Sequence, residues 1–431
     1  MTLRITALFV TTFVILFGGY TIEADSPSDA EILERISLRM QSAETATSLL
    51  FFTQDERRVT FKSMHRIYPT RSVEVNDNVY VLNRNERNLN EASYEVDGVR
   101  YTVGDFLASP YIKGLIVIQD NEILLEKYSD DHSETTRWVS FSVSKSVTSM
   151  LIGAAIKDGF IQDINEPVTY YLPRLRGTPY ETTTIKDLLA MSSGIEWNED
   201  YSDPDSDVAQ AGGANGIELV SYLAQLSKKH TPGEVFNYNT GETNLVGEIL
   251  RSAIGNNAST YLQHKIWQPF GMEFSATWLL GGTGGGETGG CCISATLRDY
   301  ARLGIFAMRN GVLPNGTETL PKDWMKDSST PSKGAAYYGY LWWLGEEGSY
   351  SARGIFQQRI AVLPASQVVI AVHSNAPTAI GGDYAKHLNG VIEGLRATLS
   401  RKIEESEIRF YRILWSGSSH RYYSNKTSVR L

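Results

Sequence analysis

Two short hydrophobic stretches, one in each half of the chain, have the length and internal spacing of β-hairpins. The first covers 115–125 and contains Asp120-Asn121, a dipeptide that favours a tight turn between antiparallel strands. The second covers 360–372, with the turn at 364–367. A helix is predicted after it, over about 384–405.

The stretch between the hairpins, about 140–330, follows mostly helical spacing. Its first helix starts at Ser142, is apolar on nearly every side as far as Ile156, and ends at Gly159. Strands at both ends with a helical insert predict one α+β unit, in which an antiparallel sheet flanked by helices joins distant parts of the chain. We expect the Ser142 helix to lie where the sheet meets the insert.

The first 24 residues have the pattern of a secretory signal. Arg4 precedes an almost unbroken apolar run over 5–20, and Ala24 offers a small residue for cleavage. This predicts a periplasmic or secreted protein, or one attached to the membrane through this segment if it is not cleaved.

The other segments outside the body carry no motif. Residues 25–95 are interpreted as a lead-in that wraps the body, with a helix over 30–48, and residues 406–431 as a C-terminal tail.

Composition and charge exclude several function classes. With 42% hydrophobic residues the chain has an ordinary globular composition, and its net charge of -9 opposes a nucleic-acid partner. No H-E-x-x-H motif occurs among the seven histidines, and the glycine-rich run 284–289 lacks the βαβ context of a dinucleotide site. We therefore expect no metal and no cofactor. The adjacent Cys291 and Cys292 leave three interpretations open: small buried residues, a disulfide between neighbours, or a reactive thiol.

The tetrapeptide Ser142-Val143-Ser144-Lys145 is the main candidate for chemistry. Residues three apart share a helix face, and a helix N-terminus favours the negative charge that develops on a serine losing its proton. Lys145 can accept that proton only when it is neutral, and burial among the apolar residues that follow would lower its pKa.

Several ordered blocks of this sequence resemble the serine hydrolases of the penicillin-binding-protein and class C β-lactamase superfamily, in particular their esterase and 6-aminohexanoate-oligomer hydrolase branch. The block at Ser142 is similar to S-x-x-K, 184–194 to T-[IV]-x-x-L-L-x-M-x-S-G, and 232–238 to P-G-x-x-F-x-Y. The resemblance covers about 95–395.

This resemblance implies a β-lactamase/transpeptidase-like fold over 96–405 and catalysis through an acyl-enzyme. Ser142 is then the nucleophile, Lys145 the base and Tyr238 a proton relay. The backbone amides of Ser142 and Ile355 would form the oxyanion hole. The implied partner is a small ester, an amide or a short peptide-like substrate.

Two departures from the family pattern concern the substrate. Thr240 replaces the asparagine of Y-x-N, so a hydroxyl would face the substrate there. The K-[ST]-G or H-x-G strand motif is missing, and the nearest cation is Arg353, whose side chain is expected on the other face of its strand. Tyr201 lies in a segment similar to a substrate-covering loop of the oligomer hydrolases.

Two alternatives stay open on the sequence. One is a β-lactamase or D-alanyl peptidase, which the missing K-[ST]-G motif disfavours. The other is a non-catalytic homologue that binds peptide or cell-wall fragments, which the intact Ser142, Lys145 and Tyr238 disfavour.

Overall fold

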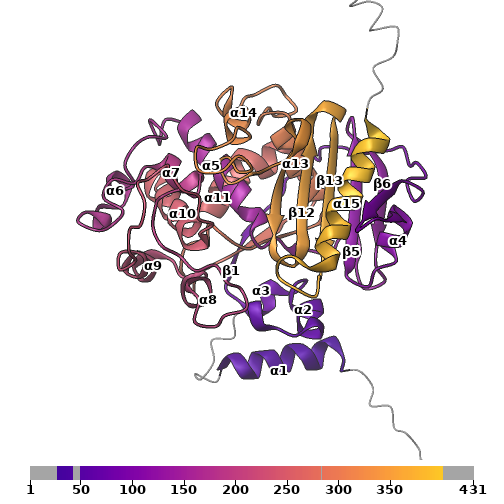
Figure 1. The fold of residues 1–431 in the computed structure, drawn as a ribbon, viewed down its shortest axis with the longest axis horizontal. Coiled ribbons are helices and arrows are strands. Elements are labelled where there is room, and N and C mark those ends of the chain that lie inside the picture. The colour runs from indigo at the N-terminus through magenta and orange to yellow at the C-terminus, as the bar shows by residue number, and fades with distance from the viewer. Residues whose placement is uncertain (1–26, 42–48, 283, 401–431) are drawn as a thin grey trace, which may run out of the picture.

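The computed structural model describes residues 27–41, 49–282 and 284–400, and Figure 1 shows their arrangement. A seven-stranded sheet lies beside a largely helical region. The predicted signal segment and the predicted tail lie outside the described residues. Within those residues, no helix is long and apolar enough to cross a bilayer.

The main sheet joins segments from distant parts of the chain, as predicted. Its strands pair antiparallel except for β2 and β6, which run parallel. In spatial order they are β10 (Trp343–Leu344), β11 (Tyr350–Gly354), β12 (Gln358–Leu363), β13 (Val368–Ser374), β5 (Ile112–Gln119), β6 (Glu122–Tyr128) and β2 (Asn83–Arg84).

Both predicted hairpins are present. The turn between β5 and β6 is formed by Asp120 and Asn121, whose φ angles of 51° and 65° are those a tight turn of this kind requires. The predicted C-terminal helix is α15 (Gly382–Leu399), and the end of that prediction, 401–405, lies outside the described residues.

Alternation along β5 supplies a hydrophobic layer to each face of the sheet. Leu115 and Val117 pack in the cluster that contains α15, whereas Ile116 and Ile118 pack in the cluster that contains α13 (Leu297–Met308). Side chains alternate between faces in a strand, so a strand that is apolar throughout is buried on both sides.

A second, four-stranded antiparallel sheet lies next to Ser142. Its order is β1 (Thr70–Val73), β8 (Ala276–Leu279), β9 (Ile293–Ala295) and β7 (Trp138–Val139). The sequence did not predict this sheet. Its strands are two to four residues long and pair over large separations in sequence, which leaves little periodic signal.

The remaining elements are mostly helices, concentrated in the predicted insert. The N-terminal part contains α1 (Asp29–Gln41), η1 (Leu49–Phe51), α2 (Gln54–Thr60), α3 (Met64–Ile67), the hairpin of β3 (Ser93–Val96) and β4 (Val99–Thr102), and α4 (Val103–Leu107). The insert contains α5 (Val143–Lys157), α6 (Val168–Tyr171), α7 (Ile185–Leu189), α8 (Asp207–Ala211), α9 (Gly216–Leu223), α10 (Thr240–Ile254), α11 (Ala258–Leu262), α12 (Gln268–Phe270) and α14 (Trp324–Ser328).

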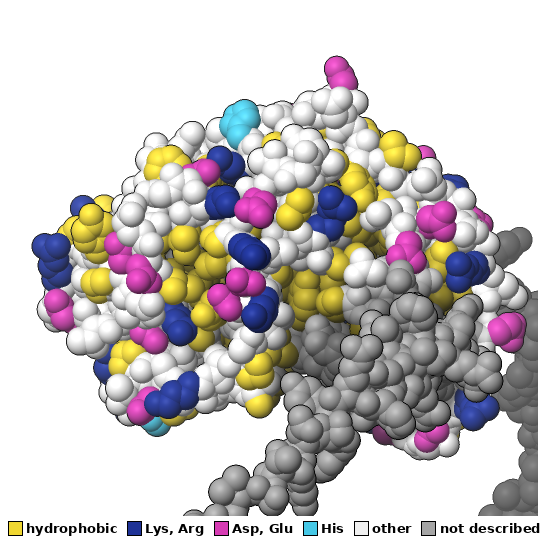
Figure 2. All heavy atoms as spheres, turned by 90° about the horizontal axis from the view of Figure 1, so that it is seen from above, with side chains coloured by type: hydrophobic (Ala, Val, Ile, Leu, Met, Phe, Trp, Pro, Cys, Tyr) yellow, Lys and Arg dark blue, Asp and Glu magenta, His cyan; other side chains and the backbone are white. Residues whose placement is uncertain are grey.

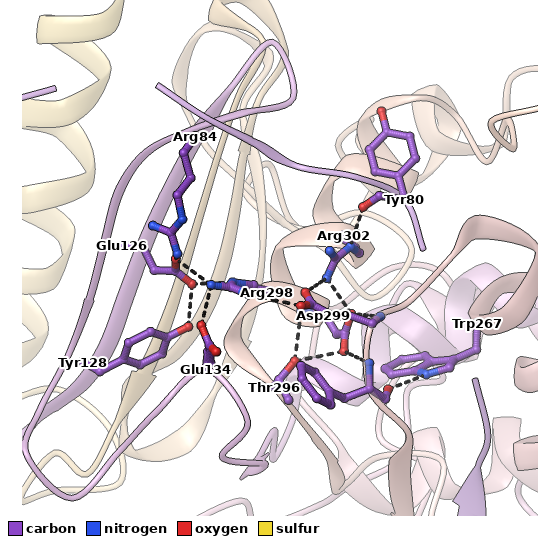
Figure 3. Close-up of polar contacts among 12 residues, drawn as sticks. Tyr80, Arg84, Glu126, Tyr128, Glu134, Trp267, Thr296, Arg298, Asp299 and Arg302 are labelled. Carbon is purple, nitrogen blue, oxygen red and sulfur yellow. Dashed lines mark hydrogen bonds and ion pairs between the residues drawn. The ribbon is translucent and has the colours of Figure 1, made fainter. Parts of the chain in front are cut away.

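A buried polar network ties the start of α13 to the sheet (Figure 3). Arg298 Nε donates to Glu126 on β6 at 2.6 Å, and the side chain of Glu126 is 2% exposed. Asp299 accepts hydrogen bonds from the backbone N–H groups of Glu273 and Phe274 at 2.7 and 2.9 Å. Because each buried charge has a partner, the network holds α13 against the sheet without leaving a bare ion in the interior.

The surface seen from above carries mixed charge. Figure 2 shows Lys and Arg side chains interspersed with Asp and Glu on this face, with hydrophobic side chains between them. Among the described residues drawn there, no continuous patch of one sign is visible.

Candidate active site

Ser142 lies at the point where β7 ends and α5 begins. It is the N-cap residue of α5, and the preceding Phe141 has a φ of 45°, a left-handed conformation that is costly for a non-glycine residue. Packing holds this turn, because the Phe141 ring lies 4.9 Å from the ring of Phe61 and 5.4 Å from that of Phe356, centroid to centroid. The packing of Phe141 therefore fixes the position of Ser142.

Lys145 is buried one turn into α5, with 1% of its surface exposed. Its Nζ donates to Thr240 Oγ1 at 3.0 Å and to the backbone oxygen of Gly290 at 2.8 Å. Burial lowers the pKa of Lys145 from 10.5 to about 8, against the opposing influence of the Glu199 carboxylate. The neutral amine is thus accessible near physiological pH.

Glu199 organises the polar groups on the far side of Lys145. Its carboxylate accepts hydrogen bonds from the Thr240 hydroxyl and from Trp197 Nε1, from the Thr240 N–H at 3.0 Å and from the Tyr201 hydroxyl at 2.7 Å. A carboxylate accepts only, so the Thr240 O–H must point to Glu199. The Thr240 oxygen is then left to accept from Lys145.

Tyr238 immediately precedes the cap of α10 and faces the Ser142–Lys145 pair. The Lys145 Nζ lies 5.4 Å from the centroid of its ring, which is stacked on Trp343 at 5.7 Å. Burial raises the pKa of Tyr238, and a side-chain hydrogen bond with Ser142 opposes that shift. Tyr238 therefore remains a neutral phenol, able to donate and to accept.

Two glycines allow the backbone to approach this group closely. A Cβ added to Gly290 would lie 2.9 Å from Lys145 Nζ, and one added to Gly354 would collide with the backbone oxygen of Ser140. Gly354 ends β11 and brings Ile355 next to the Ser142 turn. Any side chain at these positions would push Lys145 or β11 out of place.

A cavity of about 410 Å³ lies next to Ser142 and Thr240. Of the residues predicted for the site, Ser142, Tyr201, Thr240 and Ile355 line it. Lys145 is not among the lining residues, but it contacts Thr240, which is one of them.

The structure places Arg353 away from this cavity. Its Nε donates to Ser351 at 2.9 Å, its guanidinium lies 5.3 Å from the centroid of the Trp343 ring, and it lines a separate cavity of about 120 Å³ together with Arg359. Burial lowers its pKa. Arg353 is therefore not among the residues that line the cavity around Ser142.

Sequence reasoning missed several contributors. Glu199 lies two residues before Tyr201, which was singled out from the sequence, and an acidic residue so close to it was the available signal. Gly290 follows the glycine-rich run 284–289 and was not singled out. The lead-in was expected to wrap the body, yet Met40, Leu49, Leu50 and Tyr68 line the cavity itself.

The adjacent cysteines also lie at this site. Cys291 follows Gly290 and lines the cavity, and it is joined to Cys292 by a disulfide.

In the described parts of the chain, no group of three or more His, Cys, Asp or Glu residues is arranged to hold a metal ion.

Comparison with known proteins identifies the family. The β-lactamase family model matches residues 107–389. A 6-aminohexanoate-dimer hydrolase of Paenarthrobacter ureafaciens is 28% identical over 313 residues, which cover 67% of this chain and 78% of that protein. The flp protein of Staphylococcus aureus strain COL is 24% identical over 203 residues, covering 44% of this chain and 39% of that protein.

Solved structures share the fold. A structure described as a candidate 6-aminohexanoate-dimer hydrolase from Bacillus anthracis has a TM-score of 0.71 at 22% identity and covers 82% of this chain and 99% of its own. A family VIII carboxylesterase has a TM-score of 0.52 at 14% identity, covering 68% of this chain and 96% of its own. The α+β fold predicted from the sequence is confirmed, and the chain is a hydrolase that belongs to the β-lactamase family.

Proposed function

We propose that this hydrolase cleaves an ester or amide bond through an acyl-enzyme on Ser142, with Lys145 as base and Tyr238 assisting. One observation carries the proposal: the hydrogen-bond arrangement of the buried Lys145. A neutral amine has two N–H groups and one lone pair. Thr240 and Gly290 use both N–H groups, which leaves the lone pair for a proton from Ser142.

The chemistry balances with the residues present. Ser142 Oγ attacks the carbonyl carbon, and its proton passes to Lys145 directly or through Tyr238. The negative oxygen of the tetrahedral intermediate is held by the N–H groups of Ser142 and Ile355. The bond to the leaving group breaks as that group takes a proton from Tyr238, which recovers one from Lys145. Water then attacks the acyl-serine by the same steps, which releases the acid and restores Ser142.

The cavity favours substrates without a carboxylate. None of the described residues that line it is Lys or Arg, and the one acidic residue among them is Glu218. Losing a charged hydrogen bond costs about 1.5–3 kcal/mol, or roughly ten- to a hundredfold in transition-state binding. We therefore propose that simple esters are better substrates than β-lactams and that amides of small linear amino acids rank second. The amide part rests on the 6-aminohexanoate-dimer hydrolase relative.

Steady-state kinetics on one preparation tests this ranking. We expect kcat/KM to be higher for short-chain p-nitrophenyl esters than for 6-aminohexanoate dimer, and lowest for penicillins and cephalosporins. Efficient cephalosporin hydrolysis with negligible esterase activity would instead support the β-lactamase alternative.

We also propose that the protein is exported, on the strength of Arg4, the apolar run over 5–20 and Ala24. N-terminal sequencing of the mature protein should then start near residue 25. A soluble cytoplasmic product that still begins at Met1 would contradict export.

A further inference from the structure

The first described part of the chain forms a small unit beside the active site. We call residues 29–41 and 49–68 the N-terminal cap; in Figure 1 its helices α1, α2 and α3 lie below the main sheet and next to α8. The cap has a hydrophobic cluster of its own, formed by Ile32, Leu33, Ile36, Phe52 and Val59. It is therefore a packed unit.

Arg57 fastens this cap to the catalytic region. Its guanidinium donates to Asn375 Oδ1 at 3.2 Å and to the backbone oxygen of Ala376 at 3.3 Å, in the segment that follows β13. It also lies 4.5 Å from the centroid of the Phe356 ring, and Phe356 is the residue after Ile355. The cap is thus fixed directly beside the proposed oxyanion hole.

The cap supplies an apolar wall to the cavity that contains Ser142. Met40, Leu49, Leu50 and Tyr68 line that cavity, as do Val208 and Ala209 of α8. Burial raises the pKa of Tyr68, so its hydroxyl is neutral at physiological pH. This part of the wall therefore carries no charge that could hold an ionic group of a substrate.

We infer that the N-terminal cap binds an uncharged aliphatic group of the substrate, and that the substrates of this site are esters or amides with a chain of several carbons. This inference rests on the proposed function, since it assumes that the bond cleaved is the one presented to Ser142. An aliphatic chain gains binding energy by displacing water from such a wall, whereas an anionic group would lose its hydration without finding a cation among the described residues that line the cavity.

The expected size of the effect follows from the burial of methylene groups. Each methylene that enters the wall should improve binding about fourfold, the equivalent of about 0.8 kcal/mol. Over the range that the cavity accommodates, kcat/KM should therefore rise steeply with chain length.

The kinetic test uses two series of substrates, p-nitrophenyl esters with acyl chains of two to eight carbons and alkyl acetates with alcohols of the same lengths. We expect kcat/KM to rise with length in at least one series, and the rise to be flattened in Leu50→Ser and kept in the volume-conserving Leu50→Met. Leu38→Ser is the matched control, because Leu38 is also in the cap but is 60% exposed and lies outside the cavity wall. It should behave like the wild type. No dependence on length in either wild-type series, or an equal dependence in Leu50→Ser, would overturn the inference.

A binding measurement separates this inference from the proposed function. Calorimetric titration of the Ser142→Ala protein needs no catalysis and uses two series of amides, N-alkylacetamides and N-methylalkanamides, each with chains of two to eight carbons. Kd should fall about fourfold per methylene in at least one series. Such tightening in a protein whose wild type hydrolyses no ester or amide would uphold the role of the cap and reject the proposed function. A Kd independent of chain length in both series would reject the role of the cap, whatever the wild type hydrolyses.

Discussion

Glu199 affects Lys145 in two ways, through a hydrogen bond with Thr240 and through its negative charge. By orienting the Thr240 hydroxyl, the carboxylate fixes where Lys145 can donate. Its negative charge also opposes the lowering of the Lys145 pKa that burial causes. We regard Glu199 as a positioning residue for the proposed base.

The pH profile tests this role of Glu199. Only neutral Lys145 can accept a proton, so kcat/KM should rise with pH through about 8, the pKa of the buried amine. Glu199→Gln removes a charge that favours the protonated amine, so the rise should move to lower pH. A profile that falls through pH 8, or one that Glu199→Gln leaves in place, would contradict this account of Lys145.

Gly290→Ala tests the position of Lys145 at its second hydrogen-bond partner, Gly290. The new methyl group would lie 2.9 Å from Lys145 Nζ and 3.0 Å from Asn244 Oδ1, so the amine has to shift. Misplacement of a catalytic group by about 1 Å can cost about a hundredfold, and we expect kcat to fall on that order. Gly104→Ala is the matched control, because a Cβ there would meet its neighbours only at ordinary contact distances of 3.4 Å or more and Gly104 lies outside the cavity around Ser142. Equal kcat values for the two variants would exclude a positional requirement at Gly290.

At the scale of elements, α10 carries a buried carboxyl that the proposed mechanism does not use. Glu242 is 1% exposed and accepts a hydrogen bond from the Tyr180 hydroxyl at 3.0 Å. Burial raises its pKa to about 7, although hydrogen bonds from Ser193 and Tyr180 oppose the shift.

This carboxyl makes the stability of the fold depend on pH. The unfolded chain releases the Glu242 proton near 4.5 and the folded chain near 7, so the free energy of unfolding should fall as pH rises across this window. Glu242→Gln removes the titration and should lose less stability between pH 5 and 8 than the wild type, by up to about 3 kcal/mol. Urea unfolding at both pH values measures the difference. Glu196→Gln, whose carboxyl is 60% exposed, serves as the control. An identical pH dependence in wild type and Glu242→Gln would contradict this origin.

How far the elements could be predicted from the sequence depended on their length and on the range of their pairing. The hairpin around Asp120 and the helix that starts at Ser142 have strong local signals, a turn dipeptide and a long apolar run. The pairing of β7 with β9, two and three residues long, has no such signal. Tertiary folding alone brings the Glu199 carboxylate to Thr240 and the backbone oxygen of Gly290 to Lys145, so the spacing of these residues in the sequence did not predict either contact.

At the scale of the whole molecule, the network in Figure 3 joins β6, from the first hairpin, to α13. Arg298→Ala would leave Glu126 buried without its strongest partner. Removing one member of a buried ion pair typically costs about 3–5 kcal/mol, and because Arg84 and Tyr128 still contact Glu126, we expect a loss near the lower end of that range. Lys157→Ala is the control, since Lys157 and Glu318 are 38% and 50% exposed and such surface pairs contribute at most about 1 kcal/mol. Equal shifts in urea denaturation for both variants would show that the network does not stabilise the fold.

The central claim, that Ser142 is the nucleophile of a Ser–Lys–Tyr hydrolase, is tested most directly by intact-mass analysis after exposure to a fluorophosphonate, followed by peptide mapping. We predict one adduct per chain, located on Ser142, absent in Ser142→Ala and formed much more slowly in Lys145→Ala. Because members of one catalytic unit are not additive, Ser142→Ala combined with Lys145→Ala should hydrolyse esters little worse than either variant alone. An adduct on another residue, or undiminished labelling of Ser142→Ala, would contradict the account.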